Sequence, residues 1–500
     1  MSSIAGPFER FVRVAERTPE RVAMELVPEG RRVTYGELLA RAAAAAAFLD
    51  ARGVGEGTPV MTLLPSGPEL VAYLYGGFVR RATVAPLADT VTAFELAGML
   101  RAAMPAVVAL ATSRAIATLE AALALTSADV VPTVVWLGEG APPASRLPCV
   151  VPPAAGPAAI TAARLDPPPP SSIVTCHFTY KGLGRPLGVL HRYSSYAVAV
   201  DAMIAHHPGA DEGPHLVVLP MHPVYGLVSG LMAPLALGVT LVVSRLGAGA
   251  QLLDALVDHQ TRVACLVPPL LSTLASAARK RPDLAKRVHA RLDLASGGSV
   301  LEDSVADAVH ASLGREVIQG YGTTETLPVL AGRPGRVVRG TVGLPIRDDV
   351  RVAVLDVNGD PLARGARGAI AISGPTLLAR YLDDEANTRF VVGGAFRTGD
   401  LGHVDEGGHL VFYGRALPFT KSFGQMVDLR ELEDVACQFA GVIAARAVAS
   451  SDERLGECVD LTVRVATPGA FQARDLKAHL RASLSAYKLP RNLAVVGGSS

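Results

Sequence analysis

Short apolar stretches alternate with helix-like stretches through most of the first 400 residues. Strand-like runs at 60–64, 106–111 and 263–267 each precede a helical pattern, at 69–79, 113–125 and 270–278. The Ala-rich run 41–49 is also typical of a helix. Strands that alternate with helices predict βαβ units, so the pattern indicates an α/β fold with a largely parallel sheet covered by helices.

The pattern changes twice further along the chain. After about residue 340, short strands separated by Gly turns predict a small β-rich part that ends near 414. From 415 on, a helix (428–439), two strands (445–449 and 459–465) and a helix (471–484) predict an α+β module of about 85 residues, long enough to fold unaided. We therefore expect a large N-terminal domain, 1–414, and a small C-terminal domain, 415–500.

Two segments depart from this alternation. Residues 138–172 contain three proline clusters and are predicted to form an exposed loop or connector; a ligand for an SH3-type domain is a weaker interpretation. Residues 223–243 carry no charge and contain Gly226 and Gly230 as GxxxG, a length that could cross a bilayer. A buried helix followed by a strand is favoured, because no second span exists and the flanks are not basic.

Composition narrows the function classes. Lys plus Arg number 47 and Asp plus Glu 46, so overall charge gives no support for a nucleic-acid partner or a membrane surface. The five Cys form no CxxC pair, which argues against a zinc site or disulfide framework and favours the cytoplasm. The first ten residues do not resemble a signal peptide. Only six of the basic residues are lysine: Lys181, Lys280, Lys286, Lys421, Lys477 and Lys488.

Five motifs occur in a familiar order. They are Tyr-Gly-Thr-Thr-Glu at 321–325, Gly-Thr-Val-Gly-Leu-Pro at 340–345, Arg-Thr-Gly-Asp-Leu at 397–401, Gly-Arg at 414–415 and Lys-Ser-Phe-Gly at 421–424. In this order they resemble the adenylate-forming superfamily, which includes acyl- and aryl-CoA synthetases, peptide-synthetase adenylation domains and luciferase. The resemblance runs from 33–38 to 487–490. It implies two doubly wound α/β subdomains and a β-rich subdomain, followed by a small mobile α+β domain.

The resemblance also implies cofactors and site residues. Tyr321 would stack on adenine, Thr324 would bind a phosphate of ATP or AMP, and Glu325 would hold Mg²⁺, a hard cation that prefers oxygen ligands. The alternative is a loop with a surface glutamate. The full set of nucleotide-binding candidates is Ser296, Gly297, Gly298, Gly320, Tyr321, Gly322, Thr323, Asp400, Arg415, Gly184 and Gly188.

Further roles follow in the same way. Asp400 would accept the ribose hydroxyls and Arg415 would contact the nucleotide; a turn-forming aspartate and a solvated arginine are the alternatives. His222, Tyr225 and Gly226 resemble the acid-pocket segment, although His222 is displaced by one position and could equally be a capping or core histidine. The candidate catalytic residues are Thr324, Glu325, Lys181 and His222.

The phosphate loop departs from the family pattern. In 179–188 the Gly184, Pro186 and Gly188 frame is present, but the hydroxyl residues are replaced and Leu187 stands where the loop lysine is usual. Backbone N–H groups can still cradle phosphate, and Lys181 or Arg185 could supply charge from new positions. Equally, the loop could have lost its hold on a triphosphate.

The C-terminal region departs as well. No lysine follows Lys488, so the catalytic lysine of the family is missing, unless the sequence is truncated. At the hinge, Pro418 would limit domain rotation, or lie beside the pivot and change little. Phe423 replaces a usual glycine and would narrow the tunnel that admits CoA or phosphopantetheine.

Three hypotheses follow. The first is an ATP- and Mg²⁺-dependent ligase of specialised metabolism that forms an acyl- or aryl-adenylate from a small-molecule acid. It would pass the acyl group to CoA, a carrier-protein thiol or an amine, as a monomer or homodimer. The second is a divergent enzyme that skips adenylation and uses a preformed activated donor or an unusual acid such as nitrite. The third is a non-catalytic nucleotide-binding homologue.

Overall fold

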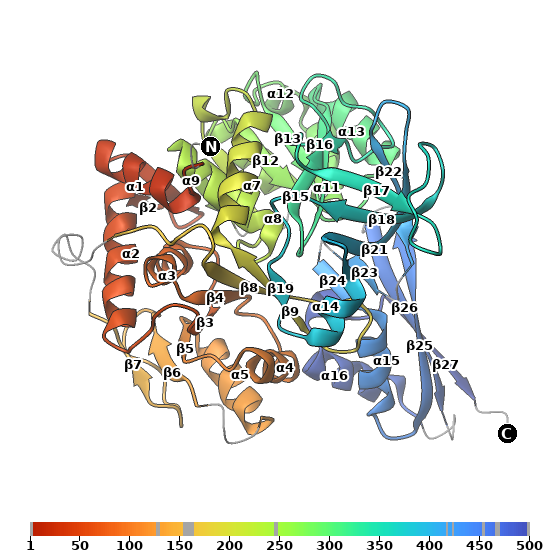
Figure 1. The fold of residues 1–500 in the computed structure, drawn as a ribbon, viewed down its shortest axis with the longest axis horizontal. Coiled ribbons are helices and arrows are strands. Elements are labelled where there is room, and N and C mark those ends of the chain that lie inside the picture. Colours follow the sequence, from red (N-terminus) through yellow and green to blue (C-terminus); the bar gives the residue numbers. More distant parts are fainter. Residues whose placement is uncertain are drawn as a thin grey trace.

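A nine-stranded mixed sheet forms one half of the large N-terminal part (Figure 1). A computed structural model describes residues 4–126, 131–153, 165–244, 249–416, 419–422, 425–452, 456–465 and 471–497. The strands are β1 (Val22–Val27), β2 (Arg31–Thr34), β10 (His215–Val217), β11 (Leu241–Ser244), β12 (Val263–Leu266), β13 (Asp293–Ser296), β14 (Val317–Thr323), β15 (Leu327–Ala331) and β16 (Leu344–Pro345). Their order is β16-β15-β14-β13-β12-β10-β11-β1-β2. In this order, the adjacent strands from β14 to β1 are parallel to one another, whereas β2, β15 and β16 are antiparallel to the strands they pair with.

An eight-stranded sheet forms the other half. Its strands are β3 (Pro59–Leu63), β4 (Thr83–Leu87), β5 (Val107–Leu110), β6 (Thr133–Trp136), β7 (Cys149–Val150), β8 (Ile173–Thr179), β9 (Leu187–Arg192) and β19 (Arg380–Tyr381). Their order is β19-β9-β8-β4-β3-β5-β6-β7, and β9 and β19 run antiparallel to the strands they pair with. Strand β7 lies inside the segment that was predicted as loop, so that prediction was too broad.

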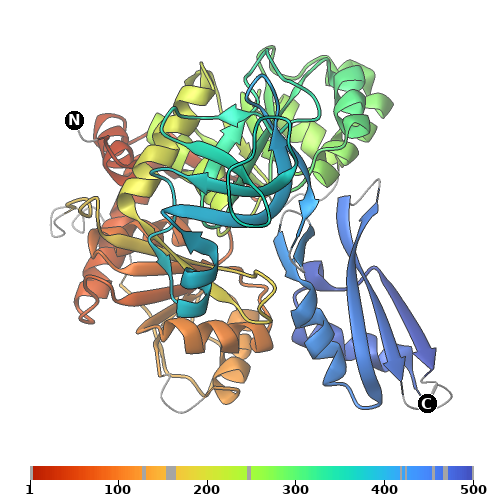
Figure 2. The ribbon, with the colours of Figure 1, turned by 45° about the vertical axis from the view of Figure 1, so that its right-hand side comes forward.

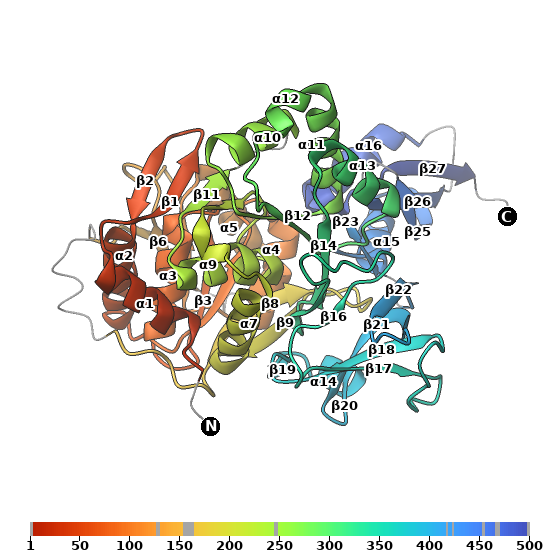
Figure 3. The ribbon, with the colours of Figure 1, turned by 90° about the horizontal axis from the view of Figure 1, so that it is seen from above.

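Helices cover both sheets (Figure 3). They are α1 (Pro7–Arg17), α2 (Tyr35–Asp50), α3 (Pro68–Val79), α4 (Ala93–Ala103), α5 (Ser113–Ala124), α7 (Tyr193–His206), α10 (Gly249–Asp258), α11 (Pro268–Lys280), α12 (Pro282–Ala285), α13 (Asp303–Leu313) and α14 (Asp384–Phe390), with a short 3₁₀ turn at Ala210–Glu212. The Ala-rich face of α2 serves close packing: a Cβ at Gly76 in α3 would lie 2.8 Å from the Ala45 side chain.

The uncharged segment 223–243 is a broken helix followed by a strand. It consists of α8 (Val224–Leu227), a π-helical turn (Val228–Met232), α9 (Ala233–Leu237) and β11. Nearly all of its side chains from 226 to 235 are buried. Within the described ranges, no helix combines the length and apolar character that crossing a membrane requires.

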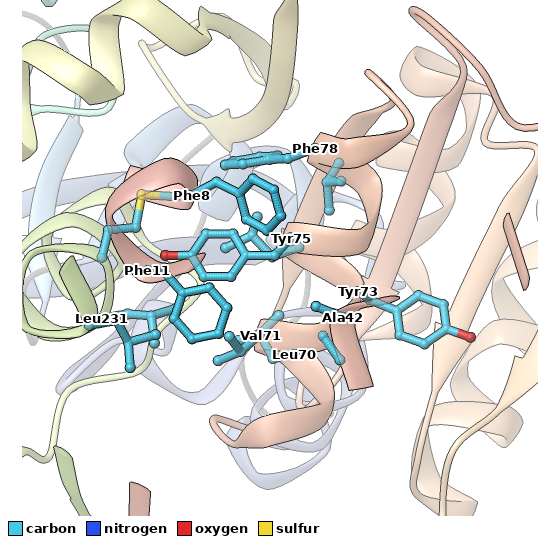
Figure 4. Close-up of a cluster of buried hydrophobic side chains, with 14 of the residues drawn as sticks. Phe8, Phe11, Ala42, Leu70, Val71, Tyr73, Tyr75, Phe78 and Leu231 are labelled. Carbon is cyan, nitrogen blue, oxygen red and sulfur yellow. The ribbon is translucent and has the colours of Figure 1, made fainter. Parts of the chain in front are cut away.

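The main hydrophobic core lies between the two large sheets. Figure 4 shows its aromatic part, where Tyr75 of α3 stacks on Phe11 of α1 with ring centroids 5.0 Å apart. The cluster also contains Phe8 of α1, Phe78 of α3 and Leu231 of the π-helical turn. Because residues of β8, β10 and β11 belong to one core, the two large sheets are held in fixed relative positions.

A smaller antiparallel sheet follows. It contains β17 (Arg351–Leu355), β18 (Gly368–Ser373), β20 (Val391–Val392), β21 (Ala395–Val404) and β22 (Leu410–Arg415). The predicted β-rich part therefore begins about ten residues later than expected, because β16 joins the nine-stranded sheet. Strand β19, which lies between β18 and β20 in the chain, pairs with β9 of the eight-stranded sheet. This pairing connects the small sheet to the eight-stranded sheet.

The C-terminal module stands beside the N-terminal part as a separate lobe (Figure 2). It contains β23 (Phe419–Ser422), β24 (Gln425–Asp428), α15 (Leu429–Cys437), β25 (Val442–Asp452), β26 (Gly456–Val465), α16 (Ala473–Ser483), a 3₁₀ turn (Ala486–Lys488) and β27 (Asn492–Gly497). It has its own core, formed mainly by α15, α16 and β26. The domain division at 414 and 415 stays a prediction, and the hinge residues Leu417 and Pro418 lie outside the described residues, as does Phe423.

Candidate active site

The candidate nucleotide motifs meet at one edge of the nine-stranded sheet. Ser296 ends β13, and Gly320 to Thr323 occupy the end of the adjacent parallel strand β14. The carboxyl ends of parallel strands are where α/β sheets bind ligands. The alternative interpretation of the 321–325 motif as a loop does not hold for its first three residues, since β14 continues to Thr323, where it pairs with β15. This pairing requires Gly322, since a Cβ there would lie 2.3 Å from the Leu327 carbonyl oxygen.

Tyr321 and Asp400 are joined directly. The Tyr321 hydroxyl donates to Asp400 Oδ2 at 2.6 Å, and Asp400 pairs with Arg415 across β21 and β22. Arg415 Nε lies 3.4 Å from Asp400 Oδ1, and the same guanidinium contacts Glu457 of the C-terminal module. Arg415 is therefore not an ordinary solvated arginine, and Asp400 is not a surface turn residue.

Glu325 is fully buried and already has partners. Its Oε1 accepts from the Tyr381 hydroxyl at 2.7 Å and lies 3.4 Å from Lys181 Nζ. Its Oε2 is buried and has no hydrogen-bond partner among the described residues. The interpretation as a surface glutamate is excluded by this burial.

The same geometry does not fit the predicted Mg²⁺ site at Glu325. Magnesium requires near-octahedral oxygen coordination, whereas an ammonium lies beside this carboxylate. In the parts of the chain that the structure describes, no three His, Cys, Asp or Glu side chains are grouped so that they could hold a metal.

The altered phosphate loop is directed away from the site in its second half. Leu187 is fully buried in a small apolar core with Val189 and Tyr381, so it cannot substitute for the usual lysine. Gly188 sits in β9, where a Cβ would lie 2.5 Å from Leu382, and its role is packing. Gly184 donates its N–H to Asp428 of the C-terminal module at 3.2 Å. Neither glycine is among the described residues that line the cavity, and their assignment as nucleotide contacts stays a prediction.

The two cationic side chains of the loop, Arg185 and Lys181, lie in different surroundings. Arg185 pairs with Asp383 and Glu385 on the surface near α14, so it supplies no charge to the site. Lys181 is 2 % exposed, and its ammonium donates to the Thr398 carbonyl at 3.1 Å. Lys181 therefore reaches the site and Arg185 does not.

One cavity of about 260 Å³ connects the predicted acid pocket with the nucleotide motifs and the C-terminal module. His222, Tyr225 and Gly297 line it, together with Tyr321 and Thr324. Other residues that line this cavity are Gly298, Gly320, Gly322, Thr323, Glu325, Lys181, Lys421, Gln425, Met426 and Tyr487. Gly226 does not line it: a Cβ there would lie 1.9 Å from the Pro220 carbonyl oxygen, so Gly226 serves packing.

Several polar atoms that border this cavity are buried without partners. Among the described residues they include Thr179 Oγ1, Ser229 Oγ, Ser296 Oγ and Glu325 Oε2. Buried polar groups are normally hydrogen-bonded, so a cluster of unpaired ones around one cavity indicates a polar ligand. A second, much smaller cavity of about 20 Å³ is bordered by Tyr321, Arg415 and Lys421.

Two titratable groups on the cavity wall have shifted pKa values. Burial lowers the pKa of His222 to about 4, so its imidazole is neutral at pH 7. Burial, reinforced by the nearby Arg415 charge, lowers the pKa of Lys421 to about 8. Lys421 can therefore hold or release a proton near neutral pH, which suits acid–base chemistry.

The C-terminal module docks through a buried charge cluster. Lys488 Nζ lies 2.6 Å from Glu95 Oε1 of α4 and 2.7 Å from Glu431 Oε2 of α15. The Tyr180 ring of the phosphate loop lies 3.9 Å from the same ammonium. Burial by itself favours the neutral amine, but the surrounding tyrosine and carboxylate oxygens raise the pKa of Lys488 above its usual range.

Sequence reasoning missed several residues of this site. Tyr381 and Glu457 lie in strand segments that carry no recognisable motif. Glu95 belongs to a Thr-x-x-Glu capping box that begins at Thr92, and Lys488 is one of six lysines. These two signals were visible, but neither indicates a contact between domains.

A known family matches most of the chain. The sequence profile of the AMP-binding enzyme family matches residues 11–382, and the chain belongs to this family. It is 30 % identical over 463 residues to 4-coumarate–CoA ligase 5 of Oryza sativa subsp. japonica, covering 89 % of this chain and 82 % of that protein.

Solved structures agree with this membership. The amide bond synthetase McbA from Marinactinospora thermotolerans is similar with a TM-score of 0.85 and 26 % identity over 98 % of this chain and 96 % of its own. A malonyl-CoA ligase in complex with methylmalonyl-CoA and AMP gives a TM-score of 0.80 at 25 % identity, over 96 % of this chain and 97 % of its own. The predicted adenylate-forming superfamily, its α/β fold and the ATP-dependent acid ligase class are confirmed, and binding of ATP or AMP belongs to that class.

Proposed function

We propose that this ligase activates a small carboxylic acid as an acyl-adenylate and transfers the acyl group to an amine. The shared cavity carries the proposal, since the predicted acid pocket, the nucleotide motifs and Lys421 of the C-terminal module border one space. The acid would lie between His222 and Tyr225. A neutral His222 would leave the acid's carboxylate free to react.

The nucleotide would occupy the edge formed by β13 and β14. Tyr321 and Asp400 would hold the adenosine, and Thr324 would meet the phosphate. Arg415, held by Asp400 and Glu457, presents a guanidinium fork toward the smaller cavity. These roles remain proposals that substitution of each residue would test.

Lys421 gives the transfer step a chemical rationale. An attacking amine forms a C–N bond to the acyl carbon while the bond from that carbon to the phosphate oxygen breaks, and AMP leaves with the electron pair. The attacking nitrogen must lose a proton, and a neutral Lys421 amine, with a pKa of about 8, can accept it.

The similarity to an amide bond synthetase over nearly the whole of both chains supports an amine as acceptor. A thiol is the second candidate, because named relatives are CoA ligases and β23 and β24 bring Lys421 to the cavity wall that an acceptor would approach. CoA or a carrier-bound phosphopantetheine would then be the acceptor. The cytoplasmic location and the monomeric or homodimeric state are kept as predictions.

The test is a two-stage assay. Pyrophosphate release would be measured with the magnesium salt of ATP and panels of aliphatic and aromatic acids. The best acid would then be offered amines, hydroxylamine or CoA, with products identified by mass spectrometry. Acid-dependent pyrophosphate release followed by amide formation is expected. Thioester as the sole product would refute the amine, and absence of both release and AMP binding would refute the site.

A further inference from the structure

Lys181 lies at a point where four parts of the chain meet. It follows β8 in the altered phosphate loop, and its ammonium contacts the Thr398 carbonyl of β21 and the Glu325 carboxylate. The rings of Phe396 in β21 and Phe419 in β23 lie 5.0 and 5.1 Å away, close enough for cation–π attraction.

Glu325 needs this ammonium. A fully buried carboxylate is strongly disfavoured unless a positive charge or several donors accompany it. Its remaining donor is the neutral Tyr381 hydroxyl, and the Arg415 guanidinium is engaged by Asp400 and Glu457. Within the described ranges, Lys181 is the one cation within ion-pair distance of Glu325.

We propose that the Lys181 ammonium replaces a protein-bound divalent cation in this chain, as the permanent counter-ion of Glu325. Glu325 and Lys181 then form an ion pair with no net charge beside the cavity. Any divalent ion enters only on the phosphates of the nucleotide, and a nucleoside monophosphate ester binds without metal. The proposal rests on the proposed function for the location of the nucleotide.

Manganese binding to the nucleotide-free protein tests the proposal without turnover. Mn²⁺ alone would be titrated by electron paramagnetic resonance into the wild type, Lys181→Gly, and Lys181→Gly with Glu325→Gln. Lys286→Gly is the matched control, because Lys286 forms an exposed pair with Asp283.

We expect no Mn²⁺ site in the wild type or the control. In Lys181→Gly we expect affinity at least about tenfold higher, lost again when Glu325 is replaced. A wild-type Mn²⁺ site that Glu325→Gln abolishes would overturn the proposal, and so would Lys181→Gly that folds but gains no Mn²⁺ affinity.

A volume-conserving series covers the case in which Lys181→Gly does not fold. In EDTA, Lys181→Met should lower the melting temperature far more than Lys286→Met, and adding Glu325→Gln should restore much of the loss. An equal effect of the two lysine variants would contradict the pairing.

AMP binding separates the two proposals. Its thermal shift should be the same in EDTA and in Mn²⁺ for the wild type. A shift that requires metal would refute the role of Lys181, whereas no shift under either condition would refute the nucleotide site itself.

Discussion

Replacing Lys488 by Met should undock the C-terminal module. Lys488 is 1 % exposed, and its ammonium is the positive charge between Glu95 of the N-terminal part and Glu431 of the module. Met keeps the volume of the side chain and removes the charge. Two carboxylates would then face each other across the boundary with nothing between them.

The magnitude follows from the geometry. Both carboxylate oxygens lie within 2.7 Å of the same nitrogen, so they are close neighbours. At about 5 Å and an effective dielectric constant of about 20, two such charges repel by about 3 kcal/mol. Removing one partner of a buried pair typically costs ~3–5 kcal/mol. A loss of about 3 kcal/mol raises the population of the undocked state by at least about a hundredfold.

Amide hydrogen exchange at Ser485 would report this undocking. The Ser485 N–H donates to Glu95 Oε1 at 3.3 Å, so its protection depends on the docked state. Lys477→Met, on the exposed face of α16, is the control and should leave exchange unchanged. In Lys488→Met the effect should diminish at low pH, because two facing carboxylates raise each other's pKa and one takes up a proton. Unchanged protection in Lys488→Met at neutral pH would refute the role given to this cluster.

Further predictions concern the cavity and the docking. Since only the neutral amine of Lys421 accepts a proton, the acyl-transfer rate should rise as pH passes through about 8; Lys421→Met should flatten this pH profile and lower the rate by about 10²–10⁴-fold. Gly297→Ala should raise KM for bulky acids more than for small ones in steady-state kinetics, because the new Cβ meets the Tyr225 ring at 2.9 Å, whereas Gly55→Ala, with open space around it, should not. Burial raises the pKa of Glu95, but the Lys488 charge and the hydrogen bonds from Lys488 and Ser485 lower it by more. The stability that this carboxylate contributes is therefore present above about pH 4.5 and should be lost below it, which thermal melting across pH would follow.

The alternation of strands and helices was predictable because it depends on local periodicity. The helical pattern at 69–79 became α3, and 263–267 became β12, each with ends within two residues. Antiparallel β9 and β19 were not predictable, since their pairing joins segments almost 200 residues apart. Local sequence carries no information on such pairing.

The site was predictable to the extent that motifs mark it. Tyr321, Thr324 and Gly297 lie on one cavity as the resemblance implied, and His222 lines it too. Gly188 and Gly226 could not be judged from sequence, because a glycine needed for packing and one needed for a ligand look identical. The pairing of Lys181 with Glu325 arises from a contact between segments more than 140 residues apart, so it became visible only in the fold.

Oxygen transfer from the acid to AMP tests the central claim most directly. An acid labelled with ¹⁸O in its carboxylate would be incubated with ATP, the magnesium salt and the preferred amine, and the nucleotide products examined by mass spectrometry. If the acid attacks the α-phosphorus and the amine then displaces AMP, the AMP formed should carry one ¹⁸O. Unlabelled AMP, or label in inorganic phosphate with ADP as the nucleotide product, would contradict an acyl-adenylate mechanism in this cavity.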